Sequence, residues 1–156
     1  MTRWTEEQFR EAQKNTRARQ MLDAMPMGKP PSVISNGIRY SVRINLPFPP
    51  TVNHIWQSSG KRRYLSKEYE AFLGMVQVIV ARAGIPRFDK QRLAVVIQLH
   101  WPNKRRGDID NRVKAVLDSL GRCKVFDDDE QVDSLVITRE NIVKGGLCVV
   151  TLEALP

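Results

Sequence analysis

Two groups of acidic residues stand out in a basic chain of 156 residues with a formal net charge of +8. Asp108 and Asp110 directly follow a basic run, and a second acidic run covers residues 127–130. Converging carboxylates repel one another unless a cation or a proton offsets their charge. A ligand set made only of oxygen atoms suits Mg²⁺ or Mn²⁺ rather than zinc. The two groups flank one predicted helix, so we expect folding of this helix onto a sheet to bring them together around a divalent cation.

Each acidic group also has a purely structural interpretation. Asp110 suits the N-cap position of the following helix, and the run VFDDDEQV suits a solvated turn before a strand. Asp108 and Asp110 are two residues apart, so their side chains point the same way only where the backbone is extended. The spacing alone leaves both interpretations open.

A divalent cation on a basic surface is suited to phosphodiester hydrolysis, because it activates water and offsets the charge that builds up on the phosphate. Lys114 follows Asp110 by one helical turn and could stabilise that charge. The alternative for Lys114 is an ion pair with Asp110 or with Asp118.

The excess of basic residues favours a polyanionic partner such as nucleic acid. Two basic triplets are the candidate phosphate-binding residues: Lys61, Arg62, Arg63, Lys104, Arg105 and Arg106. The isolated His54 and His100 are predicted to be structural or surface residues. Trp56 and Trp101 are predicted to pack in the core or at its edge rather than stack on bases.

The two cysteines, Cys123 and Cys148, lack the spacing of a zinc site or of a disulfide framework. They are typical of reduced thiols in the cytoplasm. No apolar stretch approaches the roughly 18 residues that a membrane helix needs, and the first residues do not resemble a signal peptide. We therefore expect a soluble cytoplasmic protein.

The first part of the chain is predicted to be an extension. Thr5 and Gln8 have capping-box spacing before a helix over residues 6–25, and a stretch rich in Pro and Gly follows as a linker. We place the domain boundary at Gly37, with an N-terminal extension over residues 1–37 and one domain over residues 38–156.

Hydrophobic periodicity predicts an α+β domain. Strands are expected at residues 38–46, 92–101, 132–140 and 147–155, and helices at 66–83 and 110–121. A basic loop, SSGKRRYLS, precedes the first of these helices. A segment with Lys144, Gly145 and Gly146 supplies turn residues between the last two strands.

Several motifs together resemble the RusA family of Holliday junction resolvases, including its phage and prophage versions. They are LPFPPTVNHIW, RRGDIDNRVKAVLDSL, VFDDDEQV and a closing KGG turn, in this order over residues 39–155. The element D-x-D-N-x-x-x-K with a later D-D-x-Q-V is the most specific part of the pattern.

The resemblance implies a mixed β-sheet flanked by helices and a small homodimer. It implies an enzyme that cuts four-way DNA junctions by paired symmetric nicks in DNA recombination and repair, with Mg²⁺ or Mn²⁺ as cofactor. By motif, the catalytic residues fall on Asp108, Asp110, Asp129 and Lys114. Asp128 matches a further acidic position beside the metal. Asp127 lengthens the acidic run by one residue, and a register shifted by one would make Asp128 the third ligand.

Two other functions remain as alternatives. One is a DNA-binding or architectural protein without chemistry, whose acids are caps and turns. The other is a metal-dependent nuclease of broader specificity that cuts flaps or forks. The arrangement of Asp108, Asp110, Lys114 and Asp129 favours an enzyme, because a pure DNA binder gains nothing from carboxylates beside phosphates.

Overall fold

The computed structural model describes residues 33–35 and 40–156. The helix predicted over residues 6–25 lies outside the described residues. Three residues of the segment predicted as a linker form a strand, β1 (Val33–Ser35), which pairs with the next strand. No helix in the described ranges is long and apolar enough to cross a membrane.

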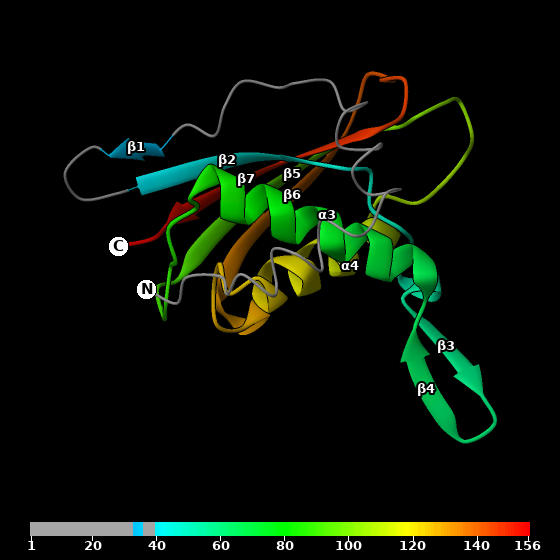
Figure 1. Cartoon of the computed structure of the whole chain (residues 1–156). Coiled ribbons are helices and arrows are strands. Elements are labelled where there is room, and N and C mark those ends of the chain that lie inside the picture. Colours follow the sequence, from blue (N-terminus) through cyan, green and yellow to red (C-terminus); the bar gives the residue numbers. More distant parts are fainter. Residues whose placement is uncertain (1–32, 36–39) are drawn as a thin grey trace.

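A five-stranded mixed sheet forms the centre of the domain, in the order β1-β2-β7-β5-β6 (Figure 1). Its other strands are β2 (Tyr40–Leu46), β5 (Leu93–His100), β6 (Val132–Glu140) and β7 (Leu147–Ala154). The pairs β2/β7 and β7/β5 are antiparallel, whereas β5 and β6 are parallel. The predicted α+β class and mixed sheet are confirmed.

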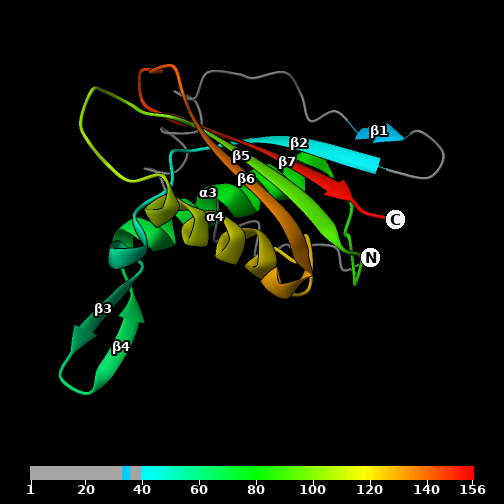
Figure 2. The ribbon, with the colours of Figure 1, turned by 180° about the vertical axis from the view of Figure 1, so that it is seen from behind.

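Two helices lie on the same side of this sheet, α3 (Lys67–Ala83) and α4 (Asp110–Arg122), as Figures 1 and 2 show. The side chain of Ser66 accepts a hydrogen bond from the Tyr69 backbone N–H and caps α3. Gly84, at φ 60°, ends α3 in the left-handed conformation that favours glycine. Both helices begin and end within one residue of the predicted bounds.

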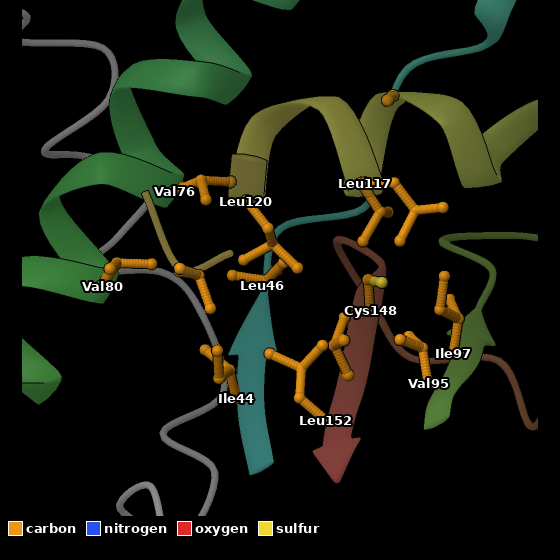
Figure 3. Packing of buried hydrophobic residues seen from close by; sticks show 14 of the residues in the cluster. Ile44, Leu46, Val76, Val80, Val95, Ile97, Leu117, Leu120, Cys148 and Leu152 are labelled. Carbon is orange, nitrogen blue, oxygen red and sulfur yellow. The ribbon is translucent and has the colours of Figure 1, made fainter. Parts of the chain in front are cut away.

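The core lies between the helices and the helix-facing side of the sheet (Figure 3). Alternate residues of β5 are buried, beginning with Leu93, because successive side chains of a strand point to opposite faces. These strand residues meet apolar positions of α3 and α4. The residues labelled in Figure 3 are Ile44, Leu46, Val76, Val80, Val95, Ile97, Leu117, Leu120, Cys148 and Leu152.

The segment predicted as a basic loop is instead a β-hairpin. Its strands are β3 (Trp56–Ser59) and β4 (Arg62–Leu65), which pair with each other and with no other strand in the part of the chain that the structure describes. Gly60 turns the chain at φ 60°. A short 3-10 helix, η1 (Val52–His54), precedes the hairpin.

Gly145 and Gly146 supply turn residues between the last two strands, as predicted: both have positive φ, and the Gly146 backbone N–H donates to the Val143 carbonyl at 2.8 Å. The two strands do not pair with each other. β5 lies between β6 and β7. Helix α4 carries the chain from the end of β5 back to the start of β6, so β6 joins the sheet parallel to β5 and at its edge. The segment after β6 then crosses β5 before β7 begins.

Candidate active site

The first acidic group lies where the chain leaves β5 and enters α4. Asp108 is exposed, and its Oδ2 lies 3.4 Å from Nδ2 of Asn111, which donates to it. Asp110 is exposed and is the first residue of α4, whereas the N-cap position belongs to Ile109. The N-cap interpretation of Asp110 is therefore wrong. Its carboxylate lies in the first turn, where the helix dipole favours negative charge.

The loop before Asp108 is held by a buried tryptophan and an arginine of β6. The guanidinium carbon of Arg139 lies 3.9 Å from the centre of the Trp101 ring, and Arg139 also donates to the Gly107 carbonyl. The backbone N–H of Val143 donates to the Trp101 carbonyl at 3.0 Å. The edge strand thus fixes the loop that presents the first acidic group.

The first turn of α4 is held by a second arginine. Nη1 of Arg112 donates to the Pro49 carbonyl at 2.7 Å, and its guanidinium carbon lies 4.9 Å from the Phe48 ring centre. Phe48 in turn packs against Trp101 at 5.0 Å in a T-shaped arrangement. Burial lowers the pKa of Arg112. Arg139, Trp101, Phe48 and Arg112 form a continuous series of ring contacts, which we call the cation–aromatic stack, next to the segment that carries Asp108 and Asp110.

The second acidic group has three different local environments. Asp127 pairs with Arg87. Asp128 caps the 3-10 helix η2 (Asp129–Gln131) by accepting a hydrogen bond from the Glu130 backbone N–H at 2.9 Å. This hydrogen bond, together with one to Asp129, lowers the pKa of Asp128. Asp129 is exposed at the first position of η2.

The two acidic groups do not meet within one chain, which corrects the expectation from sequence. They lie at opposite ends of α4, whose 13 residues separate its first and last Cα atoms by about 18 Å along the axis. Residues 40–156 contain no cluster of three or more His, Cys, Asp or Glu side chains that could hold a metal ion. The physical reason is the crossover, because α4 must span the sheet from the end of β5 to the start of β6 (Figure 2).

The ammonium group of Lys114 forms an ion pair with Asp118 at 3.0 Å, one helical turn further along α4. This is one of the two ion pairs that the sequence allowed. Both partners are at least partly exposed, so the pair contributes at most about 1 kcal/mol. Lys114 can therefore leave Asp118 for a phosphate at little cost.

The basic triplets lie on two separate elements, and all their residues are exposed. Lys61, Arg62 and Arg63 are in the β3–β4 hairpin, and Lys104, Arg105 and Arg106 are in the loop between β5 and α4. Trp101 is buried as predicted, but Trp56 is 42% exposed on the hairpin, which corrects the prediction of packing. His54 lies 3.4 Å from Glu68 on the surface, and His100 bonds to the Asn141 carbonyl at 2.8 Å.

Sequence reasoning missed the residues of the cation–aromatic stack. Arg112 belongs to the motif that contains Asp110, but nothing in its spacing indicates a contact with residues 48 and 49. Arg139 fits the alternation of a strand, and this pattern indicates an ordinary surface residue. Only the pairing of β6 beside β5 reveals that Arg139 reaches the Asp108 loop.

Comparison with known proteins identifies relatives over most of the domain. The family model for "Endodeoxyribonuclease RusA" matches residues 47–151. A crossover junction endodeoxyribonuclease of Enterobacteria phage HK97 is 36% identical over 101 residues, which cover 65% of this chain and 84% of the relative. The crossover junction endodeoxyribonuclease RusA of Escherichia coli (strain K12) is 30% identical over 109 residues, which cover 70% of this chain and 91% of the relative.

One solved structure, the OmpA-like domain of FopA1 from Francisella tularensis, covers 80% of this chain at 15% identity with a TM-score of 0.32. This similarity is too low to indicate a shared fold.

Proposed function

Because the chain belongs to the RusA family of endodeoxyribonucleases, we propose that it hydrolyses phosphodiester bonds at four-way DNA junctions. The names of its relatives, crossover junction endodeoxyribonucleases, support this substrate. The net charge of +8 and the exposed basic triplets support binding to DNA phosphates. We propose that the reaction serves DNA recombination and repair.

The proposed site contains Asp108, Asp110 and Asp129 as ligands of Mg²⁺ or Mn²⁺, with Asp128 beside them. Exposed carboxylate oxygens are the donors that these hard cations prefer, so the residues fit such an ion. When bound, the cation would activate water and offset charge on the phosphate. Lys114 would exchange its ion pair with Asp118 for the charge that develops on the phosphate.

Because the two acidic groups lie apart within one chain, we further propose that each active site is shared between two subunits of a homodimer. One chain supplies Asp108 and Asp110 at one end of α4 and Asp129 at the other end. A second copy related by a two-fold axis can present its opposite end at the same place. Isologous contacts of this kind are the usual way in which homodimers form.

Strand β6 offers the surface for this dimer. It is the last strand of the sheet, so its outer edge has no strand partner among the described residues. Leu135 and Val136, in its centre, are 41% and 47% exposed. An edge strand of nine residues with exposed apolar side chains in its centre is suited to pairing with another strand. A second β6 is a partner that would cover both the edge and these side chains.

An antiparallel β6–β6 pair would also assemble the sites. Asp129 immediately precedes β6, and Arg139 near the end of β6 holds the Asp108 loop. Antiparallel pairing centred on Val136 places the start of one β6 beside the end of the other. Asp129 of the partner subunit then approaches Asp108 and Asp110. Two equivalent sites result, which matches the approximate two-fold symmetry of a four-way junction and the need for paired nicks.

The activity is tested with an end-labelled synthetic four-way junction and a linear duplex of the same sequence, each with Mg²⁺, with Mn²⁺ and with EDTA. We expect symmetric, metal-dependent nicks in the junction alone, abolished by Asp110→Asn while junction binding persists. Tight binding without cleavage in either metal would leave a DNA-binding protein without chemistry. If flap and fork substrates are cut as efficiently as the junction, the protein is a nuclease of broader specificity for branched DNA and not a strict junction resolvase.

A further inference from the structure

The β3–β4 hairpin projects away from the domain instead of joining the main sheet (Figures 1 and 2). Its base is firmly attached. The backbone N–H of Ser66 donates to the Ile55 carbonyl at 2.9 Å, and the Ser66 hydroxyl donates to the His54 carbonyl. Ile55 is buried in the core at 1% exposure. The hairpin is therefore a projecting arm on a rigid base.

Both faces of the arm carry an aromatic ring and a guanidinium group. The register pairs Trp56 with Leu65 and Gln57 with Tyr64. Because strand side chains alternate between faces, Trp56 and Arg63 share one face and Tyr64 and Arg62 share the other. The Arg63 guanidinium carbon lies 5.6 Å from the centre of the Trp56 ring.

The exposure of these rings has no explanation in the packing of the domain. Trp56 is 42% exposed and Tyr64 is 46% exposed, although an isolated two-stranded hairpin is marginally stable and gains from burying such rings. Residues 56–65 include Lys61, Arg62 and Arg63 and no acidic residue. Aromatic rings within a positively charged element are the combination that stacks on bases while binding the neighbouring phosphates.

The arm starts from the end of the domain that holds Asp108 and Asp110. Residues 48 and 49 precede η1 and the hairpin, and they are fixed to the first turn of α4 by Arg112, which stacks on Phe48 and donates to the Pro49 carbonyl. An arm at this end would meet the DNA near the bond that is cut.

We propose that the hairpin is a wedge that enters the centre of branched DNA, where Trp56 and Tyr64 stack on the exposed faces of bases at the branch point. This inference rests on the proposed action on DNA junctions. Bases at a branch offer open faces, whereas the bases of a linear duplex are stacked on both sides. The wedge therefore selects branched DNA, and Lys61, Arg62 and Arg63 bind phosphates of either substrate.

The test measures affinity for a four-way junction and for a linear duplex in EDTA, where no cleavage occurs, by fluorescence anisotropy. Base stacking on an aromatic side chain is strong enough that we expect Trp56→Ala with Tyr64→Ala to weaken junction binding roughly tenfold or more and to leave duplex binding within about twofold. Trp56→Phe with Tyr64→Phe should restore junction binding. Arg62→Ala with Arg63→Ala should weaken binding to both substrates, and Gln57→Ala serves as the control on the same strand.

A second readout reports stacking itself. A junction with 2-aminopurine beside the branch point should change its fluorescence on binding the wild type and the Phe double variant, but not the Ala double variant. Equal losses on junction and duplex, or an unchanged 2-aminopurine signal with wild-type protein, would overturn the wedge. The proposed nuclease activity is tested separately. If that proposal is wrong, the wild type does not cut the junction in Mg²⁺ or Mn²⁺, regardless of how tightly it binds the junction.

Discussion

Two neighbouring glycines provide a matched test of how the cation–aromatic stack is supported. Gly145 and Gly146 both have positive φ, at 86° and 75°. A Cβ atom on Gly146 would lie 2.6 Å from Cβ of Phe48, a distance that requires movement, whereas a Cβ on Gly145 would meet nothing within 4 Å. Replacement of each by alanine therefore imposes a similar backbone penalty but only one clash.

The expected magnitudes follow from these two contributions. A left-handed conformation costs a non-glycine residue about 1–2 kcal/mol, and this applies to both variants. Displacement of a packed side chain adds about 1–3 kcal/mol for Gly146→Ala alone. The gain from reduced freedom of the unfolded chain is the same for both and cancels in the comparison. Gly146→Ala should therefore lower the free energy of unfolding by about 1–3 kcal/mol more than Gly145→Ala.

Urea unfolding followed by fluorescence measures this difference, and single-turnover junction cleavage measures its effect on the site. Phe48 packs on Trp101 and lies under Arg112, so its displacement should also slow cleavage by Gly146→Ala more than by Gly145→Ala. Equal unfolding free energies for the two variants would refute the close approach of Gly146 to Phe48. A destabilised Gly146→Ala protein with unchanged cleavage would refute the role of the stack in positioning Asp108 and Asp110.

Three further predictions concern single side chains. Arg139→Ala and Arg139→Lys should both slow single-turnover cleavage roughly tenfold, because lysine lacks the planar guanidinium that stacks on a ring and donates to a carbonyl. Cleavage at the wild-type rate would contradict the role of Arg139 in holding the loop before Asp108. The lowered pKa of Asp128 means that its stabilising effect is present above its unfolded pKa of about 3.9 and is lost as pH falls through the lower folded value. At pH values below about 4, the urea midpoint of the wild type should therefore decrease more than that of Asp128→Asn. Parallel pH profiles of the two proteins would argue against the Asp128 cap. Burial of Cys148 and partial burial of Cys123 raise the pKa of both thiols, to about 12 for Cys123. Iodoacetamide at pH 8 should therefore modify both thiols rapidly only in urea. Fast modification of the folded protein, detected by mass spectrometry, would contradict this shielding.

Hydrophobic periodicity predicted the elements that have a buried face. Strand β5 alternates between buried and half-buried residues, and α3 has a serine cap and a terminal glycine. These features are encoded within a few neighbouring residues, so they can be read without knowledge of the fold. The N-terminal helix, the domain boundary at Gly37 and the roles of the site residues remain predictions.

The hairpin and the strand order could not be read in this way. The hairpin strand β4 has no buried face, since only Leu65 in it is even partly buried, and a basic stretch without apolar alternation is typical of a loop. The place of β7 between β2 and β5 depends on contacts between segments that are distant in sequence. Local patterns do not contain that information.

The separation of the acidic groups was partly accessible from sequence. A predicted helix of about 12 residues between them spans about 17 Å, too far for both ends to contact one ion. Convergence was expected because the two groups flank one helix that folds onto the sheet. The length of the helix is the basis of the proposal that a second chain completes each site.

The most direct test of this shared site mixes two variants that we expect to be inactive on their own, Asp110→Asn and Asp129→Asn, and allows their subunits to exchange. Nicking of a four-way junction in Mg²⁺ is then measured. In a mixed dimer, the shared arrangement pairs the intact Asp110 of one subunit with the intact Asp129 of the other. We expect about a quarter of all active sites in the mixture to be intact, and each mixed dimer to make a single nick in place of paired cuts. A mixture as inactive as its two components, although mixed dimers form, would contradict the shared site and require all the acids of one site to come from a single chain.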